Sequence, residues 1–394
     1  MTTMPPPVDA ASSGHVPVPA PLRAPGRREL VPLGGPGFSS CAGEEVAWLL
    51  TDLTGVPLDA APTALPVEYQ PAAEHQRLFE EALAEGARHT ARAVGVLTET
   101  LIAERGREQP DGFGGNIVLA SLLRAGTPVG ILIRRWAAWG HGIRLRHYAV
   151  SMVRGRGVDP AALRYLAARH DPADVVFVDG WTGRGARTRE LVEALDGTPF
   201  TPEPAVLADP ARCARTFGTR EDLLIPSAHL DATVCGLVSR PVPVAEGAFH
   251  GARCFRELAG ADATATFLEA VTARFEEVRD EAVHEAAELV EADPEDREPD
   301  WAAWDAAERI ARERGLAHGR SSGAELVRPG VGETIRVLEQ RRPLAVLVSA
   351  SSPESAAAED LGLRQALALA GQHGVPVERV EGLPVTCAGI VAPD

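Results

Sequence analysis

The sequence contains no lysine, so all 39 of its basic residues are arginine. This absence excludes a P-loop with its phosphate-binding lysine, a protein kinase built on a strand lysine, and any enzyme that forms a Schiff base through lysine. The basic residues are also outnumbered by 55 acidic ones, which gives a formal net charge of −16. Because phosphate binding is driven by clustered cations, any anion site in this chain must be local.

Cysteine, aromatic residues and long apolar runs are scarce as well. Aromatic residues make up 5% of the chain, and no C-x-x-C pair occurs among its five cysteines. The spacing therefore favours neither a disulfide framework nor a structural zinc site. No apolar stretch approaches ~18 residues, and the N-terminus lacks a charged segment followed by an apolar one. We expect a cytoplasmic protein without a membrane span. The cysteines are Cys41, Cys213, Cys235, Cys254 and Cys387.

The 394 residues are enough for two or three domains. Residues 1–38 are rich in proline and alanine and predict a disordered lead. Residues 39–260 alternate between apolar strands and helices, residues 261–317 are helical and strongly acidic, and residues 318–394 predict a separate small α/β domain. We read the acidic segment as a solvated connector.

The alternation of short strands and helices predicts the fold class. Strands separated by helices of about ten residues indicate βαβ units, and hence a parallel sheet covered on both faces. Function is then expected at the carboxyl ends of the strands. The expected helices are 44–53, 72–104, 128–138, 160–169, 188–195, 333–340 and 361–371, and the expected strands are 116–122, 145–153, 175–179, 205–208, 344–348 and one near Val377.

The most informative loop follows the apolar strand that ends at Asp179. The residues Gly-Trp-Thr-Gly-Arg-Gly-Ala run from Gly180 into a helix that begins near Ala186. Glycines let backbone N–H groups turn inward, and a helix start adds partial positive charge, so this loop can cradle a phosphate. It is no Walker motif, since Ala186 and Arg187 stand in place of lysine and serine or threonine.

A second loop follows the strand that ends near Leu122. It consists of Arg124, Ala125, Gly126 and Thr127, and a proline stands near the first turn of the next helix. A guanidinium group beside open backbone amides suits a second anionic group. Two such loops on neighbouring strands, one of them beside an acid, predict binding of a sugar that carries phosphates at both ends.

These two loops resemble the phosphate and pyrophosphate loops of type I phosphoribosyltransferases. More narrowly, the sequence is similar to the bacterial family labelled cysteine protease StiP, which is associated with tellurite resistance and stress. The similarity lies in the stretches SLLRAGTPVG, RHYAVSMVRGRGVD and VDGWTGRG, and in LVSR and FHGAR farther on. It covers residues 38–260 and implies a phosphoribosyltransferase-like core. It also implies a C-terminal Pelota-type RNA-binding domain, of a ribosomal-protein-like α/β fold, at about residues 318–394.

The resemblance assigns roles to individual residues. Asp179 would hold the ribose hydroxyls, and Gly180 stands where the related loops carry a second acid. Arg154 and Arg156, in the turn after Val153, would close over the leaving group as catalytic residues together with Asp179. The residues that would bind the 5′-phosphate are Gly180, Thr182, Gly183, Arg184, Gly185 and Ala186, and those that would bind pyrophosphate are Arg124, Ala125 and Gly126.

The activity implied is transfer of ribose 5-phosphate from phosphoribosyl pyrophosphate (PRPP) to an unidentified base or small acceptor, with release of pyrophosphate. Mg²⁺ bound through PRPP would stabilise the departing group. The residues themselves predict no metal site built by the protein. Such cores often form homodimers, and the sequence does not identify the acceptor.

The family label points to a different enzyme, because a cysteine protease needs a nucleophilic thiol and a base. The candidate nucleophiles are Cys235, Cys254 and Cys387, and His147 or His229 is a candidate base; Cys254 also follows His250 closely. None of them lies in a local peptidase signature, and a buried inert cysteine is the ordinary interpretation of each.

A third hypothesis is a stress protein that binds without turnover, in which the core senses PRPP or a nucleotide and the C-terminal domain contacts structured RNA. Residues 320–394 carry seven arginines and nine acidic residues, which opposes a broad RNA surface, although Arg336, Arg341 and Arg342 could form a patch.

Aromatic and histidine side chains are also concentrated beside the proposed site. Stacking on a base is one reading of this group, and an aromatic packing face is the other. The residues are Trp136, Trp139, His141, His147 and Tyr148.

Overall fold

The computed structural model describes residues 45–54, 70–107, 116–316, 323–341, 343–352 and 360–393. The predicted lead at residues 1–38, as well as Cys41 and Arg342, lie outside these described residues. Within them, no helix is both long and apolar enough to cross a bilayer.

The main sheet has six strands, and every neighbouring pair in it is parallel. This confirms the expected α/β class with a parallel sheet, whereas a phosphoribosyltransferase core in the narrower sense stays a prediction. The strands are almost continuously buried, as expected where helices cover both faces of a sheet. Their order across the sheet is β1 (Ala47–Leu49), β4 (Arg146–Val150), β3 (Val118–Leu122), β7 (Val175–Trp181), β8 (Pro204–Ala208) and β9 (Thr216–Thr219).

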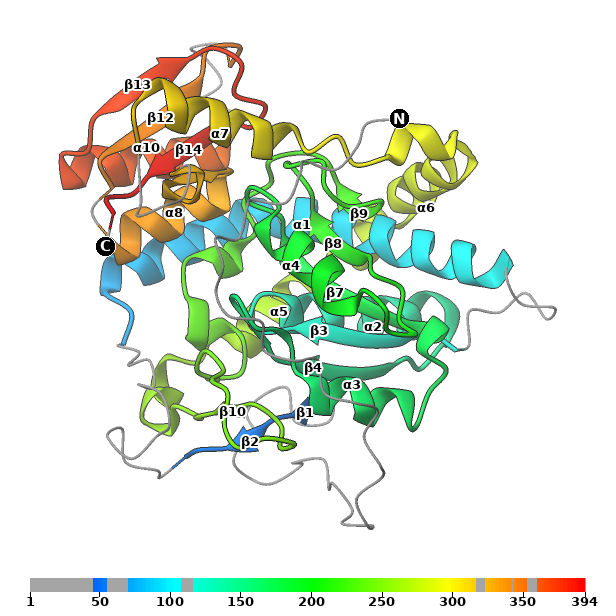
Figure 1. The fold of residues 1–394 in the computed structure, drawn as a ribbon. Helices are drawn as coiled ribbons and strands as arrows, with labels where there is room; N and C mark the ends of the chain where they lie inside the picture. Colours follow the sequence, from blue (N-terminus) through cyan, green and yellow to red (C-terminus); the bar gives the residue numbers. More distant parts are fainter. Residues whose placement is uncertain are drawn as a thin grey trace.

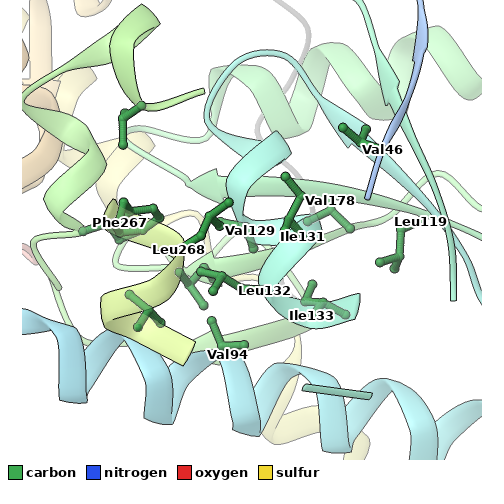
Figure 2. Close-up of a cluster of buried hydrophobic side chains, with 14 of the residues drawn as sticks. Val46, Val94, Leu119, Val129, Ile131, Leu132, Ile133, Val178, Phe267 and Leu268 are labelled. Carbon is green, nitrogen blue, oxygen red and sulfur yellow. The ribbon is translucent and has the colours of Figure 1, made fainter. Parts of the chain in front are cut away.

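Helices pack on both faces of this sheet (Figure 1). One face carries α1 (Ala73–Arg107), α2 (Gly126–His141), α5 (Thr264–Thr272) and α6 (Phe275–Glu291), and their apolar side chains form one buried cluster. Figure 2 shows Val94, Leu132 and Leu268 from three of these helices meeting close to sheet residues Leu119 and Val178. The other face carries α3 (Pro160–Ala167) and α4 (Ala186–Leu195) over a second cluster.

Helices α5 and α6 differ from the solvated connector that their acidic composition predicts. Phe267 and Phe275 are fully buried against α1 and α2, and Val278 and Ala282 continue the apolar stripe of α6. Burying a phenylalanine side chain stabilises the fold by about 1.5–3 kcal/mol. The acidic residues of α6 occupy its outer face, where Glu277 and Glu281 pair with Arg88 of α1.

The segment at residues 44–53 is also different from the prediction, because it forms strands β1 and β2 (Thr51–Asp52) and no helix. Trp48, Leu49 and Leu50 are all buried, since β1 lies beside β4 with apolar clusters on both sides. A short run that is apolar on every side has no periodicity with which to distinguish helix from strand.

A second sheet lies in the C-terminal part of the chain (Figure 1). It is mixed, because only β12 and β13 are parallel neighbours. Its order is β11 (Val327–Pro329), β14 (Cys387–Ile390), β12 (Ala345–Ser349) and β13 (Val377–Val380), and the helices α7 (Ala302–Glu313), α8 (Val331–Gln340) and α10 (Leu361–His373) accompany it. The predicted elements at residues 333–340, 344–348, 361–371 and near Val377 are thus confirmed.

Smaller elements complete the described chain. Strand β2 pairs with β10 (Gly251–Ala252), and β5 (Met152–Val153) pairs with β6 (Gly157–Val158). The short 3-10 helices are η1 (Pro172–Asp174), η2 (Pro226–Ala228), η3 (Asp231–Val234), η4 (Arg256–Ala261), η5 (Pro294–Arg297) and η6 (Ala324–Leu326).

The C-terminal sheet and its helices dock on the main domain through partly buried polar contacts. The Asp222 carboxylate accepts hydrogen bonds from the backbone N–H groups of Val331 and Thr386, both at 2.9 Å. The Trp181 indole, at the end of β7, donates to Glu333 of α8 at 3.2 Å. These contacts bring α8 and β11 over the carboxyl end of the main sheet.

Candidate functional site

The loops that follow β3 and β7 touch each other at the carboxyl end of the sheet. A Cβ placed on Gly126 would collide with the Val178 carbonyl oxygen, and one placed on Gly180 would lie 3.0 Å from Cβ of Ala125. Strands β3 and β7 are neighbours, but their chains continue into α2 and α4 on opposite faces of the sheet. Such a divergence opens a crevice where open α/β sheets bind ligands.

A cavity of about 490 Å³ occupies this crevice. Its wall combines the two loops, the segment at residues 152–154, the segment at residues 227–241, and β11 and α8 of the C-terminal part. We call it the arginine cavity, because eight arginines line it: Arg124, Arg154, Arg184, Arg187, Arg240, Arg328, Arg336 and Arg341.

Most residues predicted to bind phosphate or pyrophosphate lie in or beside this cavity. Arg124, Ala125, Arg154, Asp179, Arg184 and Ala186 line it. Thr182, Gly183 and Gly185 line an adjoining cavity of about 110 Å³, which shares Asp179 and Arg184 with the first. Their convergence is a structural fact, and their ligand roles stay predictions. Arg156 is exposed at its turn and is absent from both linings.

Asp179 forms an ion pair with Arg187, a residue that the sequence reasoning did not assign to the site. Nε of Arg187 donates to Oδ2 of Asp179 at 2.7 Å, and the backbone N–H of Gly180 donates to Oδ1 at 2.9 Å. Nη2 of Arg187 also donates to the Leu123 carbonyl, so this arginine connects the two loops. These contacts connect the two loops through Asp179, and its role toward a sugar stays a prediction.

Thr182 likewise has a structural role. Its hydroxyl donates to Asp209 at 2.8 Å and accepts from the Ala211 N–H at 3.3 Å. Asp209 also accepts N–H bonds from Cys213 and Ala214, and burial raises its pKa. The Thr182 side chain therefore holds the end of β7 against the end of β8.

The arginines of the cavity repel one another. Burial, together with the charges of Arg328 and Arg154, lowers the pKa of Arg184 to about 10. Burial and the charges of Arg154, Arg341 and Arg336 lower the pKa of Arg328, against an opposing contribution from Glu333. Like charges held in a partly dry cavity are costly unless an anion offsets them.

One of the described cysteines lines the arginine cavity. Cys235 follows η3 and its Sγ lies 3.7 Å from the Ala232 carbonyl oxygen. Burial raises the pKa of Cys213, Cys254 and Cys387, and none of these three lines either cavity. Unreactive thiols are the expectation for those three residues, because the thiolate is the nucleophile.

The candidate histidine bases have other partners. Nε2 of His147 faces Oγ of Ser121 at 2.7 Å in the sheet core, and burial lowers the pKa of His147 to about 3. His229 bonds to Glu339 and Gln365, and the Nδ1 of His250 bonds to Oγ of Ser151. Among the residues that the structure describes, no histidine lines the arginine cavity.

The aromatic and histidine side chains that were predicted to lie beside the site form a packing face, and none of them lines either cavity. Trp136 is fully buried with its ring centroid 4.8 Å from that of Phe275, and its indole N–H donates to Glu99. His141 bonds to the same carboxylate, and Tyr148 bonds to His170. The described residues also contain no cluster of three His, Cys, Asp or Glu side chains that could hold a metal ion.

Five cavity arginines were not assigned to this site by the sequence reasoning. Arg187 directly follows the predicted loop, so its neighbourhood was visible in the sequence. Arg240, Arg328, Arg336 and Arg341 come from distant segments, and only the docking of the C-terminal part brings the last three here.

The fold and the cavity define an α/β protein with an arginine-lined, cysteine-containing cavity at the carboxyl end of a parallel sheet. The chain belongs to the family described as "Tellurite-like stress resistance cysteine protease StiP", which matches residues 39–272. Residues 301–393 match the PELOTA RNA binding domain.

A curated relative from Acinetobacter baylyi, named "Cysteine protease StiP", is 41% identical over 182 residues. The alignment covers 45% of this chain and 45% of that relative. No solved structure matches the chain.

These comparisons correct the predicted activity. Both the family and the relative are described as cysteine proteases, so the prediction of a PRPP-dependent phosphoribosyltransferase is wrong. The expectation of Mg²⁺ depended on PRPP as the substrate, so it has no support once that activity is withdrawn.

Proposed function

We propose that the chain is a cysteine-dependent peptidase whose nucleophile is Cys235. The observation that carries this assignment is the position of Cys235, the one described cysteine in the wall of the arginine cavity. The family description supplies the reaction class.

The cavity provides an electrostatic reason for reactivity at this cysteine. Arg240 and Arg124 line the same cavity, and Nη1 of Arg124 donates to the Val238 carbonyl near Cys235 in the chain. A guanidinium group close to a thiol favours the thiolate, and Cys235 shares its cavity with these two arginines. Attack of the thiolate on a peptide carbonyl forms a thioester and releases an amine, which takes up a proton. Water then hydrolyses the thioester and restores the thiol.

The test compares two isosteric substitutions in the full chain. Cys235→Ser removes the proposed nucleophile, whereas Cys254→Ser changes a buried thiol outside the cavity. Cleavage of a mixed peptide library, followed by mass spectrometry, is expected to fall by at least about 1,000-fold for Cys235→Ser and to persist in Cys254→Ser. Iodoacetamide is expected to label Cys235 before the other described cysteines. Undiminished cleavage by Cys235→Ser would remove the assignment.

A second candidate function is RNA binding by the C-terminal part. The observation that favours it is the match of residues 301–393 to the PELOTA RNA binding domain. Arg328, Arg336 and Arg341 of this part face the arginine cavity, so a bound RNA would enter it or lie across its mouth. Filter binding of a structured RNA across a salt series tests this function, since phosphate contacts weaken steeply with salt.

A further inference from the structure

Three arginines from separate segments line the arginine cavity and take no part in the proposed peptidase reaction. Arg154 lies in the turn between β5 and β6, Arg184 in the loop between β7 and α4, and Arg328 in β11. Their charges act on one another: Arg328 and Arg154 both destabilise the cationic form of Arg184, and Arg154 does the same to Arg328. The fold therefore holds three like charges together.

The carboxylates of the cavity do not balance these charges. Eight arginines but only three acidic residues, Asp179, Glu190 and Glu333, are found among the described lining residues. Asp179 is paired with Arg187, and Glu190 accepts an N–H bond from Gly155. Glu333 bonds to the Trp181 indole and offsets part of the charge of Arg328, and Glu325 and Glu308 act in the same way on Arg184. An excess of five positive charges thus lines one cavity of a strongly anionic chain.

Arg184 is held ready for a ligand. Its guanidinium carbon lies 4.7 Å from the ring centroid of Trp304, so the group stacks on an aromatic face of α7. Its Nε is buried and has no hydrogen-bond partner among the residues that the structure describes. A planar guanidinium that is oriented by stacking and keeps one unpartnered N–H matches the oxygens of a phosphate group.

We propose that the arginine cavity binds a diphosphate or triphosphate group, with Arg154, Arg184 and Arg328 as its ligands. Such a group carries three or four negative charges in a small volume, which suits a cavity with an excess of positive charge. The cavity volume of about 490 Å³ is ample for it. The site is complete only when the C-terminal part is docked, because Arg328 belongs to that part. The proposal does not depend on the reactivity of Cys235.

Calorimetry on the full chain with inorganic tripolyphosphate tests the proposal. Arg184→Gln and Arg328→Gln are each expected to weaken binding about tenfold or more, because each removes a charge-assisted contact. Arg144→Gln removes the same charge from an exposed residue outside the cavity and is expected to bind within about twofold of the wild type.

Thermal melting without ligand separates a binding role from a structural one. Since Arg184 and Arg328 repel each other, either glutamine variant is expected to melt at the wild-type temperature or above it. Equal affinity of the wild type and both variants for tripolyphosphate would overturn the proposal. So would displacement of the anion by polyglutamate but not by ATP, which would assign the cavity to acidic peptides.

The phosphate group can belong to a free nucleotide or to the 5′ end of an RNA. One RNA hairpin prepared with a 5′-triphosphate and again with a 5′-hydroxyl distinguishes these sources from ATP. Tight binding of the triphosphate hairpin but not of ATP identifies the 5′ end of an RNA as the ligand. Tight binding of ATP but of neither hairpin identifies a free nucleotide. Either result supports the site if the binding is lost in Arg328→Gln. Equal binding of the two hairpins that is unaffected by Arg328→Gln contradicts it.

Discussion

Nδ1 of His229 lies 2.7 Å from Oε1 of Glu339, and both side chains are almost completely shielded from solvent. The other ring nitrogen lies 2.8 Å from Oε1 of Gln365, whose amide nitrogen in turn donates to the Leu78 carbonyl. Both ring nitrogens of His229 therefore have an oxygen atom within hydrogen-bonding distance. This network connects α1 and η2 of the main domain with α8 and α10 of the C-terminal part.

Removal of one partner of this network is expected to be costly. Glu339→Ala leaves the buried Nδ1 of His229 without its hydrogen-bond partner, and we expect a loss of about 2 kcal/mol in the free energy of unfolding. Urea denaturation measures it. Glu313→Ala, which breaks the exposed pair with Arg309, is the control and is expected to change stability by less than about 0.5 kcal/mol. Equal losses in the two variants would show that the buried pair adds nothing.

Asp222 makes the stability of the fold depend on pH. Burial raises its pKa from 3.8 to about 6, although the N–H bonds from Val331 and Thr386 oppose the shift. The folded chain thus holds this proton more tightly than the unfolded chain. The resulting stabilisation is complete below about pH 4 and is lost as the pH rises through about 6, a change of about 3 kcal/mol at most.

Asp222→Asn is expected to abolish this dependence. Urea unfolding of the wild type and the variant from about pH 4 to pH 7 would show the wild type losing stability relative to the variant as the pH rises. Asp196→Asn, at an exposed position, serves as the control and is expected to follow the wild-type slope. Parallel curves for the wild type and Asp222→Asn would contradict the assignment.

Two glycines of α2 are expected to respond in opposite ways to replacement by alanine, because only Gly126 lies at the contact between the two loops. Gly126→Ala introduces a methyl group against the Val178 carbonyl and is expected to cost about 2 kcal/mol. Gly140→Ala, where the nearest atom is Nε1 of Trp136 at 3.8 Å, is expected to stabilise the chain by up to about 1 kcal/mol. Thermal or urea unfolding of both variants checks this, and a Gly126→Ala protein as stable as the wild type would show that the loops separate readily.

The sequence was sufficient to place both loops, because each one follows a buried apolar strand and precedes a helix. Gly126 and Gly180 mark the points of close approach, and both strand ends were read to within two residues. The same local reasoning failed at residues 44–53, where Trp48, Leu49 and Leu50 are buried in a strand pattern without alternation.

The rest of the site depends on contacts between distant segments, which local patterns do not encode. Nothing around Arg328 indicates that β11 will lie over the end of β7, since that position follows from docking through Asp222, His229 and Trp181. The similarity to StiP is confirmed, whereas the resemblance of the two loops to those of type I phosphoribosyltransferases misled about the reaction, because glycine loops at strand ends serve many chemistries.

The walls of the arginine cavity come from both the main domain and the C-terminal part of the chain. This limits which substitutions are tolerated where the two parts meet. A hybrid that joined residues 39–272 of this chain to the C-terminal part of a diverged homologue would lose the docking contacts of Trp181 and His229 wherever that homologue lacks counterparts of their side-chain partners. A substitution at one of these contacts must therefore be matched by a compatible residue in the other part of the chain, as between the subunits of an obligate heterodimer.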